Sequence, residues 1–581
     1  MNTQTSLLGE FKKLPKLWPY LRASKGRVYL AIFLMPLILV AHSGVPFVLK
    51  STIDEGILLK DPDRILLGAG IFLLLVILEY TLKTSQTILL ALSVHKMISR
   101  LRNTLIRHVL ALSPSYHDRS LSGALVTRAT SDFDNMSESL NQAVISAALD
   151  IALITGAIAG MFILDWRLAL SVVVVLPFVS LIVTWFSKAL KKTMLHARVK
   201  IARLNAFTQE CLYGISTVKL LGAETQASQK VSTQAIDYRN AQMKSVVLDA
   251  FMFALLDGIS SISIGVFLWF AARSLSLDTG AISAGVVVGF VAFIVRLYDP
   301  LKQLGQKIAM LQGAFTSIDR IFSILETKDF IHGKKKIETM KGKVTFQKVT
   351  FSYDKTQKPI LKNVDFHIKE GESLAIVGPT GSGKSTIIKL LSKMYAGFDG
   401  DILIDDTSIK ELDPENLRSK MAIVPQDITL FEGSIAFNIS LGLKEISRQD
   451  VQQAAKIVGA HDFIMALPNT YDFELTSMGA NLSQGQRQLL AFARALVRKP
   501  ALVILDEATS SVDPKSEAAI QGAISKMLAD RTVIIIAHRL TTIAHCNQIL
   551  VLKDGEVTEQ GGHQDLLDLK GVYAQMQADL H

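Results

Sequence analysis

The chain has 581 residues, of which 49% are hydrophobic and only 20% are charged, and its formal net charge is +10. Soluble chains usually carry about 25% charged residues, and disordered chains are poor in apolar residues, so this composition excludes a disordered protein and is unusual for a soluble one. Two cysteines, Cys211 and Cys546, are too few for a disulfide scaffold. A basic chain can bind nucleic acid, and that interpretation depends on where the positive charge lies.

The positive charge belongs to the first part of the chain. Residues 1–330 hold 33 Lys and Arg against 22 Asp and Glu, a net charge of +11, whereas residues 331–581 hold 29 against 30, a net charge of −1. Nucleic-acid binding requires a basic patch on a soluble domain, and the part of this chain with a soluble pattern is slightly acidic. We therefore expect no nucleic-acid partner.

Long apolar segments fill the same basic part. About 20 helical residues cross the hydrocarbon core of a membrane. Six segments meet or approach this length with at most one charged residue each, which predicts an α-helical domain with six membrane spans. They are residues 28–49, 65–82, 141–164, 168–187, 250–272 and 279–295.

The loops between these segments indicate how the domain is oriented. The N-terminal arm and the two long loops, at 83–140 and 188–249, carry 23 Lys and Arg, against five in the three short loops. Positive residues concentrate on the cytoplasmic side, so we expect a multi-pass protein of the bacterial inner membrane with both termini in the cytoplasm. The predicted parts are a cytoplasmic arm at 1–27, a transmembrane domain at 28–328 and a nucleotide-binding domain at 329–581.

The two long loops repeat apolar residues at helical spacing, for example at 94–112 and 194–220. This pattern predicts that membrane helices continue into the cytoplasm. Residues 116–118 and 210–214 are the candidate turns between these extensions.

A phosphate-binding loop follows a predicted buried strand at 373–377. The sequence Gly378-Pro-Thr-Gly-Ser-Gly-Lys-Ser385 has GxxxxGK[ST] spacing and leads into a predicted helix at 386–391. Glycines at 378, 381 and 383 let backbone N–H groups wrap phosphates at a helix N-terminus. Lys384 can then reach the β and γ phosphate oxygens, and the Ser385 hydroxyl can ligate Mg²⁺.

Two further strands end in chemically capable residues. The buried strand 501–505 leads into Asp506 and Glu507. Asp506 can hold the Mg²⁺ shell, which leaves Glu507 to polarise an attacking water. The apolar strand 533–537 leads into His538, which lies at the ligand edge if the sheet is parallel.

Together these residues resemble a known family. The order Tyr353, the loop 378–385, Gln426, Leu482-Ser-Gln-Gly-Gln486, Asp506-Glu507, Asp513 and His538 resembles the nucleotide-binding domain of ABC transporters. With six preceding spans, the chain resembles an exporter-type half-transporter, similar to MsbA-type lipid flippases and bacterial multidrug exporters. Two stretches of the membrane part resemble the family as well: Ser122-Gly-Ala-Leu-Val-Thr-Arg128 with Asp132-Phe-Asp134, and Tyr298-Asp-Pro-Leu301 with Ser317-Ile-Asp-Arg-Ile-Phe322.

The resemblance implies that the chain binds ATP and Mg²⁺ and hydrolyses ATP to drive transport. Tyr353 would stack on adenine, and Gln426 and His538 would act beside Glu507 at the γ-phosphate. The expected catalytic residues are Glu507, His538 and Gln426, and the expected Mg²⁺ ligands are Ser385, Gln426 and Asp506. The expected nucleotide contacts are Tyr353, Gly378, Gly381, Gly383, Lys384, Ser385, Thr386, Ser483, Gly485, Gln486 and Asp513.

A second chain follows from the same resemblance. Ser483 and Gly485 would contact the γ-phosphate bound to the other subunit, so each ATP site needs a P-loop from one chain and a signature from its partner. Because this chain has one of each, we expect a homodimer, and a heterodimer with a different half-transporter is the alternative. The two turns would dock on the ATPase domains and drive the bundle between inward- and outward-facing states.

Three features depart from the commonest family pattern. Gln484 stands where most signatures have Gly, the loop 476–481 lacks the usual Glu, and the turn Ser510-Ser-Val-Asp513 is a mild variant. The missing Glu leaves contact between this loop and the partner chain without its expected residue.

The cargo is less defined by the sequence. We expect a lipid or another hydrophobic or amphipathic molecule to be exported; an ATP-gated channel or sensor is a further alternative. About 27 residues precede the first span, so we expect no N-terminal peptidase domain. The acids Glu79, Asp150 and Asp257 interrupt apolar segments. They either line a cavity for a cationic amphiphile, pair with cations of other helices, or lie beyond the bilayer.

Overall fold

The computed structural model describes residues 14–119, 122–141, 146–276, 282–354, 358–506, 514–528, 531–536 and 543–578. The chain divides into two compact units. The first comprises Met1–Leu110 and Leu121–Thr327, and the second comprises Ala111–Ser120 and Lys328–His581. The short segment Ala111–Ser120 therefore belongs with the C-terminal part of the chain, although it lies far from it in sequence.

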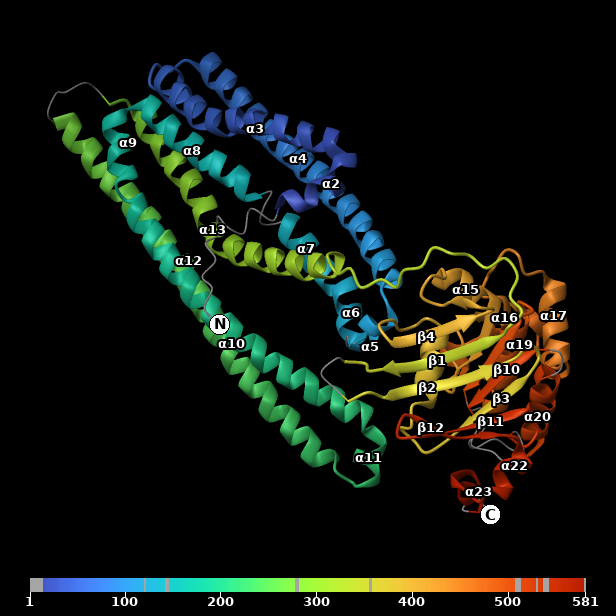
Figure 1. Cartoon of the computed structure of the whole chain (residues 1–581). Helices are drawn as coiled ribbons and strands as arrows, with labels where there is room; N and C mark the ends of the chain where they lie inside the picture. The colour runs from blue at the N-terminus through green and yellow to red at the C-terminus, as the bar shows by residue number, and fades with distance from the viewer. Residues whose placement is uncertain are drawn as a thin grey trace. The chain divides into compact units, whose positions relative to one another are not determined.

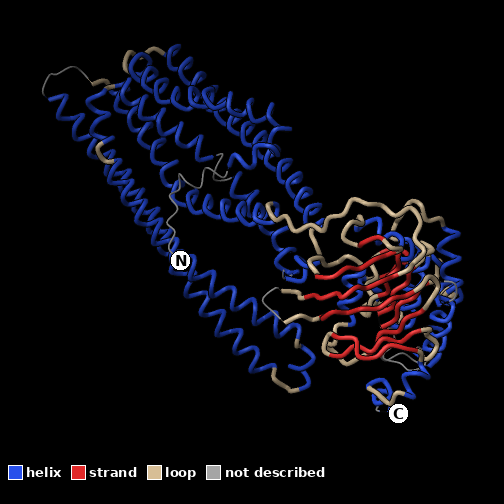
Figure 2. The backbone as a smooth tube through the Cα atoms, in the orientation of Figure 1, coloured by secondary structure: helices blue, strands red, loops and turns tan. Residues whose placement is uncertain are grey.

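The first unit is helical throughout its described residues (Figures 1 and 2). Its elements are η1 (Leu14–Leu17), α2 (Trp18–Leu21), η2 (Arg22–Ser24), α3 (Lys25–Ser51), the π-helical turn η3 (Thr52–Ile57), α4 (Pro62–Ala111), α6 (Ser122–Ala129), α7 (Ser131–Ser139), α8 (Ser146–Leu164), α9 (Trp166–Val173), α10 (Leu176–Tyr213), α11 (Ile215–Leu220), α12 (Glu224–Ser276) and α13 (Ala284–Leu325).

Six helical stretches among the described residues are long and apolar enough to cross a membrane, which confirms the six predicted spans. They are Pro15–Ile57, Pro62–Ala111, Ser146–Leu164, Trp166–Tyr213, Glu224–Arg273 and Ala284–Lys302. Parts of two predicted spans, residues 142–145 and 279–281, lie outside the described residues.

The helices continue well beyond a hydrocarbon core, as the sequence predicts. Helices α4 and α12 have 50 and 53 residues, which corresponds to about 75–80 Å of helix against a core about 30 Å thick. The chain leaves α4 at Ala111 and forms the short helix α5 (Pro114–Arg119), at the predicted turn. The sequence predicts the second turn at 210–214, but residues 210–213 still belong to α10, and the turn begins at Gly214 and includes α11.

The interior of the first unit is packed mainly between α8, α9, α10, α12 and α13. Phe267 of α12 and Phe290 of α13 stack with ring centroids 5.0 Å apart, and both are fully buried. Helices α10 and α12 run side by side over much of their length (Figure 1). These contacts hold α13 at the centre of the helical packing.

The second unit is an α/β domain with two main sheets. A parallel sheet, joined at one edge by antiparallel β12, has the order β12-β11-β3-β10-β9-β6, and an antiparallel sheet has the order β2-β1-β4-β5. The strands are β1 (Val344–Phe351), β2 (Leu361–Ile368), β3 (Ser373–Val377), β4 (Asp399–Ile404), β5 (Thr407–Ser408), β6 (Met421–Val424), β7 (Gly433–Ser434), β8 (Glu474–Leu475), β9 (Leu502–Asp506), β10 (Thr532–Ile536), β11 (Gln548–Lys553) and β12 (Glu556–Gly561).

Helices and buried clusters cover the two faces of the parallel sheet. One cluster joins the sheet to α17 and α19, and the other joins its opposite face to the antiparallel sheet and α14. The described helices of this unit are α5, α14 (Lys384–Leu391), α15 (Pro414–Lys420), α16 (Ile435–Ser440), α17 (Arg448–Ile457), α18 (His461–Met465), η5 (Thr470–Asp472), η6 (Ser477–Gly479), α19 (Gln484–Leu496), α20 (Pro514–Leu528), α22 (His563–Asp568) and α23 (Val572–Ala578). The two buried clusters hold the parallel sheet in place, and the predicted nucleotide-binding residues follow its strands.

Candidate nucleotide site

The parallel register brings four strand ends to one edge of the sheet. Strand β10 pairs in parallel with β3 and β9, and β9 pairs in parallel with β6. Ile536 of β10 is level with both Ile376 of β3 and Asp506 of β9. The carboxyl ends of these four strands therefore lie at a common edge, where parallel sheets bind ligands.

The P-loop connects β3 to α14 and depends on its glycines. Gly383 is the N-cap of α14 with φ of +104°, and Gly378 has φ of +152°. A Cβ on Gly378 would lie 2.1 Å from the carbonyl oxygen of Leu552, so no other residue fits there without displacing β11. The loop consequently presents its backbone at the N-terminus of a helix, a site suited to phosphate.

The side chains of this loop are arranged for the same chemistry. Lys384 is buried, and its Nζ donates to the carbonyl oxygens of Gly378 at 2.6 Å and Pro379 at 3.0 Å. Ser385 is exposed in the first turn of α14, and its neighbour Thr386 is buried. The ammonium of Lys384 is thus held directly over the loop that would enclose the phosphates.

Two oxygen-bearing side chains share the edge with Ser385. Asp506 is the last residue of β9, and the exposed Gln426 follows β6, the neighbouring strand. Hydroxyl, carboxylate and amide oxygens are ligands that Mg²⁺ prefers. Among the described residues, no group of three or more His, Cys, Asp or Glu could hold a metal. The mixed set Ser385, Gln426 and Asp506 has the oxygen chemistry that Mg²⁺ prefers and stays a prediction for its ligands.

Three predicted residues lie outside the described part of the chain. Glu507 follows β9, Asp513 precedes α20, and His538 comes two residues after the end of β10. The ends of β9 and β10, which these residues follow, are described and adjacent. The placement of Glu507 and His538 at this edge stays a prediction.

The signature stretch forms the start of α19. Ser483 is the N-cap, its Oγ accepts from the backbone N–H of Gln486 at 3.2 Å, and Gln486 Oε1 accepts from the backbone N–H of Ser483 at 2.9 Å. Ser483 is exposed, whereas Gly485 is buried. The capping box fixes the N-terminus of α19, so the exposed residue Ser483 lies at the positive end of a helix.

The variant loop before the signature is closed by a local contact. Asn481 Oδ1 accepts from the backbone N–H of Thr476 at 3.2 Å, and Asn481 Nδ2 donates to the carbonyl oxygen of Glu474 at 3.0 Å. Met478 inside this loop has φ of +59°. Asn481 thus holds the turn together in a loop that lacks the usual Glu.

Tyr353 belongs to an aromatic cluster beside the P-loop. Its hydroxyl lies 3.1 Å from Thr386 Oγ1, and its ring packs edge-on against Phe351 and Tyr395, with centroids 5.1 and 5.0 Å away. The side chain remains 40% exposed. An exposed aromatic ring next to a phosphate loop can receive a nucleotide base by stacking.

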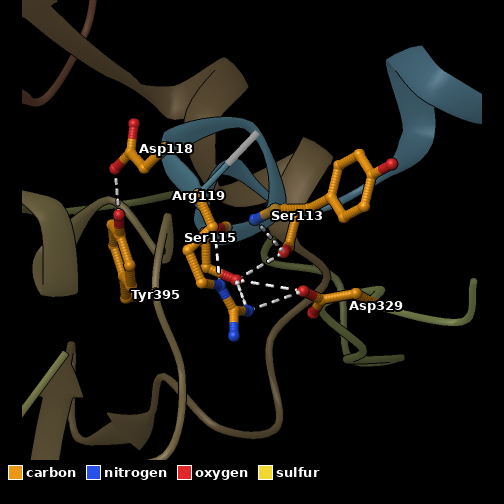
Figure 3. Close-up of polar contacts among 7 residues, drawn as sticks. Ser113, Ser115, Asp118, Arg119, Asp329 and Tyr395 are labelled. Atoms are coloured by element: carbon orange, nitrogen blue, oxygen red, sulfur yellow. Dashed lines mark hydrogen bonds and ion pairs between the residues drawn. The ribbon is translucent and has the colours of Figure 1, made fainter. Parts of the chain in front are cut away.

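Helix α5 is attached to the same unit at two places (Figure 3). Ser115 Oγ and Arg119 Nη2 both contact the carboxylate of Asp329, at 3.2 and 3.1 Å. On the other side of α5, the hydroxyl of Tyr395 donates to the carboxylate of Asp118. The first predicted turn therefore packs on residues of the ATPase unit.

The three acids of the apolar segments each have a cationic partner on α13. Glu79 contacts His42 Nδ1 at 2.8 Å and Arg296 Nη1 at 3.1 Å, Asp150 pairs with Lys307, and Asp257 pairs with Lys302 at 2.5 Å. Glu79 and Asp150 are buried. These contacts agree with the interpretation that the acids pair with cations of other helices. The hypothesis that one or more of them line a cavity for a cationic amphiphile stays a prediction.

The two family-like stretches of the membrane part meet in space. Asp132 of α7 is buried and contacts Arg320 of α13 at 3.3 Å, and Asp134 contacts Arg102 of α4 at 3.0 Å. Phe133 between them is fully buried. Helix α7 is thereby tied to both α4 and α13.

The fold, the sheet edge and the preceding helices define a membrane protein with a P-loop ATPase domain. Residues 28–301 match the family described as "ABC transporter transmembrane region", and residues 361–510 match "ABC transporter". The chain belongs to the ABC transporter family, and it is an ATP-hydrolysing integral membrane transporter of the exporter type.

Individual relatives agree over nearly the full length. The chain is 32% identical over 577 residues to an "ATP-dependent lipid A-core flippase" of Mannheimia succiniciproducens, covering 99% of this chain and 98% of that one. It is also 32% identical to an "Uncharacterized ABC transporter ATP-binding protein YfiC" of Bacillus subtilis, covering 97% and 93%. A solved structure, "Structure of a bacterial Atm1-family ABC exporter with ATP bound", is similar with a TM-score of 0.79 and 29% identity, covering 96% and 98%.

The sequence did not identify several residues that the structure places in contact. Asp118 falls in the predicted turn, but its partner Tyr395 is 277 positions away. Lys302 and Lys307 lie beyond the predicted span 279–295, although helical spacing along α13 could have suggested them. No sequence signal points to Tyr395 or Lys389, because each is an ordinary residue whose contact arises only in the fold.

Proposed function

We propose that this chain is one half of a homodimeric exporter that uses ATP to move a lipid or another hydrophobic or amphipathic molecule across, or between the leaflets of, the bacterial inner membrane. Residues 28–328 would form the transmembrane domain and residues 329–581 the nucleotide-binding domain. Both termini would lie in the cytoplasm, in agreement with the 23 Lys and Arg on that side.

The observation that carries the dimer is that one chain holds both a P-loop and a capped signature serine, on different elements. The P-loop connects β3 to α14, whereas Ser483 caps α19, which packs against α16, α17 and α20. Each of the two regions has an exposed serine, Ser385 in the first turn of α14 and Ser483 at the N-cap of α19. Two copies related by a twofold axis would present two identical pairs of half-sites, as an isologous interface requires.

The proposed chemistry assigns one task to each side chain. Backbone N–H groups of the P-loop and Lys384 bind the β- and γ-phosphates, and the exposed ring of Tyr353 stacks on adenine. Glu507 accepts a proton from the attacking water, while Gln426 and His538 orient that water and the γ-phosphate. Mg²⁺, held by Ser385, Gln426 and Asp506, would supply charge neutralisation at the phosphate oxygens.

The remaining nucleotide contacts would close the site from the partner chain. Ser483, Gly485 and Gln486 of one chain would meet the γ-phosphate bound to the other, with the helix α19 N-terminus favouring its negative charge. ATP would therefore hold the two ATPase domains together, and hydrolysis would release them. Asp513 would support the turn after the catalytic carboxylates.

A lipid-like cargo is supported by two lines of argument. Several relatives of nearly full length carry the name lipid A-core flippase. In this chain, Glu79, Asp150 and Asp257 are neutralised by their own cations, so recognition by an unpaired acid is not favoured. We therefore expect hydrophobic contacts to contribute more to binding of the cargo than ion pairs with these acids do.

The test is transport by the purified chain alone in proteoliposomes. ATP should drive fluorescent phospholipid or lipid A from one leaflet to the other, and the same lipids should stimulate ATP hydrolysis more than hydrophobic drugs do. Glu507→Gln should abolish both activities while ATP remains bound. A chain that hydrolyses ATP but moves neither lipids nor hydrophobic drugs, or that conducts ions when ATP is added, would refute the proposal.

A further inference from the structure

The contact between α5 and the aromatic cluster links a turn of the membrane helices to the expected adenine position. Asp118 is the penultimate residue of α5, and α5 begins three residues after α4 ends at Ala111. Its carboxylate accepts from the hydroxyl of Tyr395 and lies 3.8 Å from Lys389 Nζ (Figure 3 shows the contact with Tyr395). One carboxylate of the turn thus contacts two side chains of the ATPase unit.

Both partners of Asp118 also contact Tyr353. The buried ring of Tyr395 packs edge-on against Tyr353, with centroids 5.0 Å apart and an interplanar angle of 82°. Lys389 Nζ lies 5.5 Å from the centroid of Tyr353 and 5.6 Å from that of Tyr395, within the range of a cation–π contact. Lys389 belongs to α14, four residues after Ser385, so the P-loop helix is part of the same cluster.

The hydrogen bond from the Tyr395 hydroxyl to the Asp118 carboxylate persists across the physiological pH range. Burial, followed by the hydrogen bond to Asp118, raises the pKa of the Tyr395 hydroxyl well above its usual value. The phenol therefore remains a neutral donor to a carboxylate throughout the physiological pH range. Hydrogen bonds to charged groups are stronger than those between neutral groups.

We infer that Asp118, Tyr395 and Lys389 form an adenine-positioning relay, in which α5 holds the ring of Tyr353 in the orientation that receives the adenine base. The inference rests on the proposed function, because it takes Tyr353 to be the stacking residue. Tyr395 and Asp118 are positioning residues, since they touch Tyr353 or its neighbours and not the nucleotide.

The relay makes adenine affinity and the docking of α5 depend on one another. If α5 holds Tyr353 in place, undocking α5 weakens the binding of the base. By thermodynamic linkage, a bound base must then strengthen the docking of α5 by the same factor. Nucleotide occupancy would thus be reported to the end of α4 through three side chains of one chain.

The test compares ATP with inorganic tripolyphosphate, which offers phosphates without a base. In the full-length purified chain, Tyr395→Phe removes only the hydroxyl, and Asp118→Asn removes the charge. Each should raise the KM for ATP about five- to tenfold, within the range expected for loss of one hydrogen bond, with kcat retained. The inhibition constant of tripolyphosphate should be unchanged, and the double variant should be no worse than the more affected single variant.

A matched control is available in the same domain. The buried Tyr471 also loses one hydrogen bond, to His461 Nδ1 at 2.8 Å, when it is changed to Phe, but it lies in the other cluster of the core. Tyr471→Phe should leave the KM for ATP unchanged. An equal rise in KM for Tyr471→Phe and Tyr395→Phe, or an equal loss of tripolyphosphate affinity, would overturn the relay.

The relay and the proposed function fail in different ways. If Tyr353→Ala raises the KM for ATP and neither Tyr395→Phe nor Asp118→Asn does, the relay alone is overturned. If Tyr353→Ala has no effect, the adenine role of Tyr353 is overturned together with the relay. A wild-type chain that does not bind ATP would instead overturn the proposed function.

Discussion

At the scale of single residues, the helical unit is organised by compensated charges. Glu79 is buried between α3, α4 and α13, where its carboxylate meets His42 and Arg296, and Arg296 Nη1 also donates to the carbonyl oxygen of His42 at 2.7 Å. The pair Asp257–Lys302 is different, because the Asp257 side chain is 63% exposed. A buried charge that loses its partner is costly, whereas an exposed pair contributes little.

This difference predicts unequal effects of removing two cations of α13. Arg296→Met should destabilise the protein by about 3 kcal/mol, because Glu79 stays buried without its guanidinium partner and keeps only His42. Lys302→Met should cost only about 0–1 kcal/mol. Thermal unfolding of the purified variants in detergent measures both effects, and the double variant Glu79→Gln/Arg296→Met should recover much of the loss. Equal destabilisation by the two single substitutions would contradict this description of the charges.

Some site residues belong to one short sequence motif, and others come together from distant parts of the sequence. The P-loop could be predicted because Gly378, Gly383, Lys384 and Ser385 act within eight consecutive residues, and the structure arranges them as backbone and side chains of one turn. The bond from Tyr395 to Asp118 and the pair of Lys307 with Asp150 join distant segments. Such contacts are created by the packing of whole elements, and no spacing rule in the sequence encodes them.

At the scale of elements, α13 is the common partner of the helical unit. It provides Arg296, Lys302 and Lys307 to three different helices, and Arg320 to α7. Its packing against α8 requires a small residue, since a Cβ on Gly160 would lie 2.4 Å from the ring of the buried Phe293. The existence of both helices could be predicted from apolar length, but their close approach depends on which residues face each other.

The close approach predicts different outcomes for two glycine substitutions. Gly160→Ala should destabilise the protein by roughly 1–3 kcal/mol, because α8 and α13 must separate or Phe293 must leave its rotamer. Gly258→Ala in α12, where an added Cβ meets nothing within 4 Å, should be neutral or stabilise by about 0.5–1 kcal/mol through helix propensity. Thermal unfolding in detergent distinguishes the two. A neutral Gly160→Ala would show that α8 and α13 are not packed this closely.

At the scale of the whole molecule, the account depends on two chains sharing their ATP sites. Each chain carries one P-loop and one capped signature helix, so the proposed dimer would contain two composite sites, each made from both chains. A chain with a defective P-loop still offers an intact signature, and a chain with a defective signature still offers an intact P-loop. Two inactive variants can therefore build one intact site together.

Mixing these variants is the most direct test. Lys384→Ala and Ser483→Arg should each abolish ATP hydrolysis alone, while equal amounts of the two, coexpressed and reconstituted, should recover about a quarter of the wild-type activity if the two sites act independently. Half of the dimers would then be mixed, and each would hold one intact site. Mixtures that remain as inactive as either variant alone, or a wild-type chain that needs a different half-transporter for activity, would contradict the homodimeric account.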